Sequence, residues 1–220
     1  MVRKLGNLKS ALLLGAIVLA CIVRGGDARA ADPQTALLAG GCFWCTEADF
    51  EKLPGVIGAV SGFAGGDVEN PTYRQVVRGG TGHIETVLVT FDPAVVSYRE
   101  IADTFLRSID PLDAGGQFCD RGHTYSPAIF ALDADQARIA GNALRDAADA
   151  LGLPETKVAL REAAPFYEAE DYHQDYYKSQ DLILTRFGPQ TKAAAYAKYR
   201  AACGRDARLR EVWGDDAFTG

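Results

Sequence analysis

The segment Gly40-Gly41-Cys42-Phe43-Trp44-Cys45 has the residue types and the spacing that most readily suggest chemistry. A short apolar stretch precedes the glycines, and residues 42–53 have a helical pattern, so we expect Cys42 at a helix N-terminus. Free N–H groups and a partial positive charge at such an end stabilise a thiolate and lower the pKa of a thiol. We therefore predict that Cys42 is a nucleophile. The alternative is an inert thiol buried beside core aromatic residues.

Glu85 is unusual because its carboxyl group stands on the apolar side of a predicted strand. In residues 83–91 every second position faces the same way, which places Glu85 beside Val87, Val89 and Phe91. Such a carboxyl group is either solvated at the start of the strand or desolvated. Burial would raise its pKa and make it a general acid near neutral pH. The sequence leaves both possibilities open.

A glycine-rich loop over residues 110–124 follows later in the chain and contains Cys119 and Asp120. Loops longer than about 12 residues in a small domain are often functional. Tyr73 and Tyr125 flank this material and could donate phenolic hydrogen bonds, although each taken singly could be an ordinary half-buried aromatic residue.

The cysteines suggest two alternatives from other classes of protein. A thiol–disulfide oxidoreductase would use Cys42 and Cys45 as a C-x-x-C pair, but no proline is obviously placed to support that pair. A structural zinc module would use these two thiols together with Cys119 and Cys203. The long separation of Cys119 from Cys203 argues against zinc, so we expect no metal.

Residues 1–30 have the pattern of a secretory signal. A basic start precedes the uncharged apolar run 11–23, and Ala28-Arg29-Ala30 fits a cleavage site. The run is shorter than the roughly 20 residues that span a bilayer, so we expect no stable membrane span in the mature chain. We predict export, with a periplasmic location. The alternative is a lipoprotein anchored through Cys21.

The composition is that of a globular protein. The chain has 220 residues, of which 48% are hydrophobic and 24% charged. Without residues 1–30 it carries 18 basic and 28 acidic side chains, and this negative charge argues against a nucleic-acid partner. Mixed helix and strand patterns favour an α+β fold. We assign residues 31–190 to a catalytic domain, 191–220 to a C-terminal tail, and expect a monomer.

Taken together, these motifs resemble the A-type peptide methionine sulfoxide reductases over roughly residues 36–177. The matching motifs follow the family's order, which makes the resemblance specific. They are Gly-Cys-Phe-Trp at 41–44, Asn-Pro-Thr-Tyr at 70–73, Thr-Gly-His at 81–83 with Glu85, Asp-Pro at 110–111, Asp-Arg-Gly at 120–122 with Tyr125, Ala-Ile-Phe at 128–130, and Ala-Glu-Asp-Tyr-His-Gln at 169–174.

The resemblance implies a two-layer α+β sandwich around a mixed, largely antiparallel sheet with a ferredoxin-like core. It implies reduction of the S epimer of methionine sulfoxide, free or in proteins, and hence repair of oxidised proteins. Cys42 would be the nucleophile, Glu85 the acid that protonates the sulfoxide oxygen, and Asp120 a residue that holds the site together.

Four aromatic residues would contact the substrate under the same resemblance. Tyr73 and Tyr125 would hydrogen-bond the sulfoxide oxygen. Phe43 and Trp44 would receive the substrate methyl group.

The reaction would leave a sulfenic acid on Cys42, which a second thiol converts into a disulfide. A thioredoxin-like donor would reopen that disulfide, without another cofactor. The candidates for the resolving thiol are Cys203, Cys119 and Cys45. We favour Cys203, because a mobile tail could reach the sulfenic acid. Cys45 stands where the family usually has a non-cysteine residue, and the pairing of the other thiols stays open.

Overall fold

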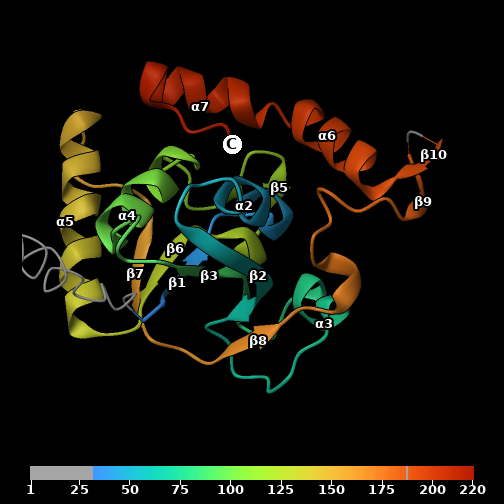
Figure 1. Ribbon diagram of the computed structural model, residues 1–220, viewed down its shortest axis with the longest axis horizontal. Coiled ribbons are helices and arrows are strands. Elements are labelled where there is room, and N and C mark those ends of the chain that lie inside the picture. The colour runs from blue at the N-terminus through green and yellow to red at the C-terminus, as the bar shows by residue number, and fades with distance from the viewer. Residues whose placement is uncertain (1–31, 187) are drawn as a thin grey trace, which may run out of the picture. The chain divides into compact units, whose positions relative to one another are not determined.

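Six strands form the main sheet, in the order β7-β6-β1-β3-β2-β8 (Figure 1). The computed structural model describes residues 32–186 and 188–220. In this sheet β6 and β7 are parallel and the other neighbouring pairs are antiparallel, so the predicted α+β class with a mixed, largely antiparallel sheet is confirmed. The strands are β1 (Gln34–Ala39), β2 (Val56–Ala64), β3 (Ile84–Phe91), β6 (Ala128–Ala131), β7 (Ala159–Glu162) and β8 (Phe166–Glu168).

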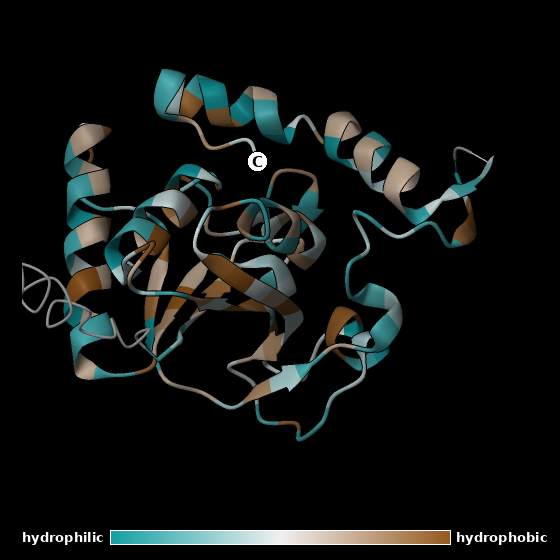
Figure 2. Cartoon of the chain, in the orientation of Figure 1, coloured by the Kyte–Doolittle hydropathy of each residue, from teal (hydrophilic) through white to brown (hydrophobic). Residues whose placement is uncertain are grey.

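Strand β3 lies between β1 and β2 and carries Glu85 into the interior. The predicted alternation is confirmed, because Glu85, Val87, Val89 and Phe91 are all buried. Glu85 pairs with Phe63 of β2 in the antiparallel register. Figure 2 shows that the central strands are the most apolar part of the described chain, whereas the helices have mixed faces.

The helices that precede the C-terminal segment are α2 (Phe43–Phe50), α3 (Tyr73–Arg78), α4 (Tyr98–Arg107) and α5 (Ala134–Ala150). Helix α4 begins with a capping box, in which the Ser97 hydroxyl accepts a hydrogen bond from Glu100 N at 3.2 Å. The cap of α3 is Thr72, whose hydroxyl accepts a hydrogen bond from the Gln75 amide.

The segment 191–220 differs from the predicted tail. It contains α6 (Lys192–Ala202) and α7 (Arg205–Trp213), which follow one another above α2 in Figure 1. Leu209 and Trp213 join the main core, and an ion pair of 2.8 Å joins Arg200 to Asp49 of α2. Cys203 is therefore held at the C-terminal end of α6 and does not lie on a free tail.

Short elements complete the described chain. The helix expected over 169–177 is a single 3-10 turn at Asp171–His173. Other 3-10 turns are at His123–Tyr125 and Gly214–Asp216, and the remaining strands form two small hairpins: β4 (Gly116–Gln117) with β5 (Asp120–Arg121), and β9 (Leu182–Thr185) with β10 (Gly188–Thr191).

No helix within the described ranges is both long and apolar enough to cross a membrane. The predicted signal segment and Cys21 lie outside the described residues.

Candidate active site

Cys42 is the residue immediately before the first turn of α2. Its carbonyl oxygen accepts hydrogen bonds from Cys45 N at 3.0 Å and Thr46 N at 3.3 Å. Gly41 has a φ of +81°, and a Cβ atom there would overlap the side chain of Gln117. The glycine turn and the helix start predicted from the sequence are therefore confirmed.

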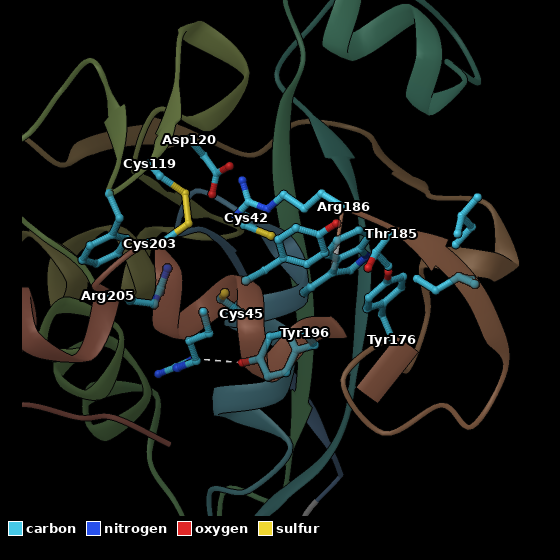
Figure 3. A pocket seen from close by; sticks show the side chains of 16 residues that line it. Cys42, Cys45, Cys119, Asp120, Tyr176, Thr185, Arg186, Tyr196, Cys203 and Arg205 are labelled. Atoms are coloured by element: carbon cyan, nitrogen blue, oxygen red, sulfur yellow. Dashed lines mark hydrogen bonds between the residues drawn. A yellow bond between two sulfur atoms is a disulfide. The ribbon is translucent and has the colours of Figure 1, made fainter. Parts of the chain in front are cut away.

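Four cysteines line one cavity of about 440 Å³ (Figure 3). Cys42 is half-buried and Cys45 is buried, and both are free thiols. Cys119 and Cys203 come from the loop before β5 and from the end of α6, and they form a disulfide. Asp120 lies on the same wall as this disulfide. The fold thus gathers residues that are far apart in the sequence around the Cys42 sulfur.

Glu85 is a desolvated acid and not a solvated strand end. Its residue exposure is 2%, and its Oε2 atom accepts a hydrogen bond of 2.9 Å from Phe43 N. Burial raises the pKa of Glu85 well above its usual value, and the negative charge of Asp120 adds to the shift. The hydrogen bond from Phe43 opposes this shift without cancelling it. Its surroundings therefore favour the protonated form of Glu85.

Tyr73 and Tyr125 belong to the same electrostatic cluster. Burial, followed by the charge of Glu85, raises the pKa of both phenols. Burial also raises the pKa of Asp120, while Arg205 opposes that shift. The two phenols consequently remain neutral hydrogen-bond donors beside the protonated acid.

Five ring-bearing side chains pack together beside Cys42 and form what we call the aromatic wall: Phe43, Trp44, Tyr73, His173 and Tyr176. The sequence did not indicate a role for His173. Trp44 stacks on Tyr176 with ring centroids 3.7 Å apart, and Trp44 Nε1 donates a hydrogen bond of 3.2 Å to His173 Nδ1. The His173 ring lies 5.0 Å from that of Phe43 and 4.2 Å from that of Tyr73. Burial lowers the pKa of His173 to about 4, so it is a neutral acceptor that orients Trp44.

The surroundings of Cys42 oppose the expected lowering of its pKa. The pKa of Cys42 is raised by its interaction with the Cys45 sulfur, by burial, and then by the charges of Glu85 and Asp120. The first amide of α2, which would have stabilised the thiolate, is bonded to Glu85 instead. The hydrogen bond with Cys42 lowers the pKa of Cys45 to about 7, with help from Arg205 and Arg200.

Comparison with known proteins gives the family. The family model described as peptide methionine sulfoxide reductase matches residues 34–214, which include every candidate site residue outlined above. This chain belongs to the peptide methionine sulfoxide reductase family. The family's match extends through α6 and α7, and therefore includes the segment that the sequence alone suggested was a tail.

Several reductases of this family are similar over most of the chain. The peptide methionine sulfoxide reductase MsrA/MsrB of Vibrio cholerae is 49% identical over 195 residues, which are 88% of this chain and 48% of that protein. The chain thus spans about half the length of this relative. The peptide methionine sulfoxide reductase MsrA 2 of Rhizobium meliloti is 45% identical over 193 residues, covering 88% of this chain and 90% of the relative.

Solved structures of two reductases share the fold. Methionine sulfoxide reductase A of Corynebacterium diphtheriae is 33% identical with a TM-score of 0.59, and the match covers 66% of this chain and 73% of that chain. Reduced Mxr1 of Saccharomyces cerevisiae is 28% identical with a TM-score of 0.61, covering 66% of this chain and 83% of that chain.

Proposed function

We propose that this chain reduces the S epimer of methionine sulfoxide, free or within proteins, to methionine. The observation that carries this proposal is the meeting of one thiol with a protonated acid and two neutral phenols. Cys42, Glu85, Tyr73 and Tyr125 lie close enough to shift one another's pKa values. Family membership supports the same reaction.

The chemistry requires donors on one side of the substrate and a sulfur nucleophile on the other. A sulfoxide sulfur becomes electrophilic when its oxygen is protonated or strongly hydrogen-bonded. Glu85 would give its proton to that oxygen while Tyr73 and Tyr125 hydrogen-bond it. Cys42 would attack the sulfur, and the proton lost by its thiol replaces the proton given by Glu85. The products are methionine and a sulfenic acid on Cys42.

The apolar part of the substrate would lie against the aromatic wall. Phe43 and Trp44 would receive the methyl group, and the neutral His173 would hold the indole in place through its 3.2 Å hydrogen bond. Asp120 would stand beside the reacting groups without contacting the substrate methyl group. We propose this arrangement as the basis for choosing one epimer at sulfur.

A second thiol of the chain would convert the sulfenic acid into a disulfide, and an external dithiol protein would then supply electrons. The Cys119–Cys203 disulfide supports this part of the proposal, because Cys119 is exposed and Cys203 half-buried. A thioredoxin-like protein could reach such a bond and open it by thiol–disulfide exchange. The scheme needs no prosthetic group. We further propose that the chain acts as a monomer, because each of these residues comes from the same chain.

A general thiol–disulfide oxidoreductase is the competing function, and the contact between the Cys42 and Cys45 sulfurs favours it. Such an enzyme would need both cysteines and would have no use for Glu85. The buried acid and phenols therefore favour the sulfoxide reductase.

An activity assay driven by dithiothreitol tests the proposal. The full chain should convert methionine sulfoxide to methionine, and Cys42→Ser should abolish the conversion. Cys119→Ser should leave turnover with this small reductant measurable, which controls for loss of a surface thiol. Full activity of Cys42→Ser would reject the proposed nucleophile.

We propose export as a separate property, based on the pattern of residues 1–30. Fractionation of cells that express the full chain should place it in the periplasm. Cys21→Ser distinguishes a cleaved signal from a lipid anchor, since it should release only an anchored protein. Retention of the chain in the cytoplasm would reject export and would leave the proposed reaction unaffected.

A further inference from the structure

Cys45 is a buried thiol to which the reaction above gives no specific task. It lies one helical turn after Cys42, and both sulfurs belong to the same cavity (Figure 3). Its residue exposure is 9%, and it packs with Ala48, Tyr176 and Tyr196. Cys42 also packs against this cluster, and the two thiols influence one another's pKa.

A disulfide between these positions is sterically ordinary. Cys42 is the N-terminal cap of α2, so Cys45 is three residues further on the same face of the first turn. Helix geometry places Cα atoms at this spacing about 5 Å apart, which lies within the range that disulfides span.

The surroundings of Cys45 favour a negative charge on its sulfur. Arg205 of α7 is 2% exposed, and its Nε atom has no hydrogen-bond partner among the described residues. Arg200 of α6 is half-buried, and it donates a hydrogen bond of 3.0 Å to the Tyr196 hydroxyl, shown by the dashed line in Figure 3. Asp49 partly balances these cations through its ion pair with Arg200. The interaction with the Cys42 thiol lowers the pKa of Cys45 to about 7; burial and Asp49 oppose this shift, and both guanidinium groups support it.

Cys45 and the two remaining cysteines differ in their access to a protein partner. Cys45 is buried, whereas Cys119 is exposed and Cys203 is half-buried. A protein donor could therefore reach the Cys119–Cys203 pair but not Cys45. In the structure that outer pair is oxidised while Cys42 and Cys45 are both free thiols.

We propose that Cys45 resolves the sulfenic acid on Cys42, and that the Cys119–Cys203 pair then reduces the resulting Cys42–Cys45 disulfide. This relay deepens the proposed function and rests on it. In this relay Cys45 takes the resolving role for which the sequence favoured Cys203. Cys203 lies at the C-terminal end of α6 and is bonded to Cys119.

The steps of the relay balance. The Cys45 thiolate attacks the sulfur of the Cys42 sulfenic acid, a sulfur–sulfur bond forms, and the departing hydroxide takes a proton to become water. The reduced Cys119–Cys203 pair attacks next and passes through a mixed disulfide. It ends oxidised while Cys42 and Cys45 return to thiols. An external dithiol then reduces Cys119–Cys203.

Single-turnover experiments on the fully reduced full chain test the relay. Without any added reductant, the wild-type chain should yield about two methionines per chain, because two dithiol pairs supply electrons in series. The double variant Cys119→Ser with Cys203→Ser should yield about one methionine and accumulate a Cys42–Cys45 disulfide. Mass spectrometry of alkylated peptides identifies the disulfide.

Cys45→Ser removes the proposed resolving thiol. Cys45→Ala is a second variant, in case the serine hydroxyl destabilises this buried position. Both should yield about one methionine and leave a sulfenic acid on Cys42 that a dimedone probe labels. Formation of a Cys42–Cys119 or Cys42–Cys203 disulfide at the wild-type rate in these variants would overturn the relay. No methionine from the wild-type chain would instead reject the proposed function itself.

Discussion

The backbone N–H of Phe43 donates a hydrogen bond of 2.9 Å to Oε2 of Glu85. This contact fixes the acid of β3 against the first turn of α2, directly beside the residue that carries the nucleophile. It also occupies the amide that would otherwise have stabilised a Cys42 thiolate. The acid is thereby positioned, while burial keeps its proton in place.

Glu85→Gln should lower kcat for sulfoxide reduction by about 10²-fold or more, the size expected for loss of a general acid. The amide preserves the shape of the side chain and can still meet Phe43 N through its oxygen. Initial rates with dithiothreitol measure the effect. Glu47→Gln is the matched control, because Glu47 of α2 is a second buried carboxyl group, and its oxygens are bonded to Ser61 and to the Asp175 amide instead of Phe43 N.

The pH dependence of the reduction rate should also depend on the proton of Glu85. Because the pKa of Glu85 is raised, its acid form persists above the usual carboxyl range and disappears as the pH rises through that raised pKa. The wild-type rate should therefore contain a decline toward high pH that Glu85→Gln lacks. Identical profiles in the two proteins would remove Glu85 from the proton transfer.

Tyr73→Phe and Tyr125→Phe should each lower kcat/KM, by roughly 10²-fold, because each removes one donor from the sulfoxide oxygen. The double variant should lose more than either single variant. Tyr177→Phe provides a control, because the Tyr177 hydroxyl donates its hydrogen bond to Glu51 and has no part in the proposed proton transfer. An unchanged rate in both single variants would mean that the phenols do not contact the reacting oxygen.

Thiol reactivity should follow the order set by the surrounding charges. Cys45, whose pKa is lowered to about 7, should be alkylated with a midpoint near pH 7, and Cys42 should require a higher pH. Peptide mapping after brief labelling of the reduced chain separates the two sites. The reverse order would show that Cys42 carries the thiolate in the resting protein.

Arg205→Met should reduce the free energy of unfolding by roughly 2–3 kcal/mol, because it leaves buried carbonyl groups without their donor. Arg205 donates to the backbone oxygens of Ser108 at 2.7 Å and Gly40 at 3.4 Å. Urea unfolding measures the change, and Arg210→Met on the exposed side of the same helix is the control. Equal stability of the two variants would show that Arg205 does not fasten α7 to the core.

The sequence predicted the position of Cys42 at a helix start and of Glu85 on the apolar side of a strand, because both signals are local. A glycine pair ahead of a helical segment marks the turn at Cys42, and strict alternation in β3 reveals the inward-facing acid. The raised pKa of Cys42 was not predictable in this way. It arises from the interaction with Cys45, from burial, and from the charges of Glu85 and Asp120, which only the fold brings near Cys42.

The C-terminal helices α6 and α7 were not predicted, because their sequences lack such local signals. The sequence of α6 is rich in alanine and lysine, and α7 holds several charged residues, so neither has a clear apolar stripe. Arg205 has the residue type of a solvent-exposed position, yet it is buried by contacts with Gly40, Ser108 and the ring of Phe118. Its effect on Cys45 therefore became visible only in the folded chain.

The most direct measurement of the central claim follows the two epimers of methionine sulfoxide separately during turnover by the full chain with dithiothreitol. We expect the S epimer to disappear with formation of an equal amount of methionine, while the R epimer persists. Equal consumption of both epimers, or consumption of neither, would contradict a site in which Cys42 and the protonated Glu85 act from opposite sides of one sulfur.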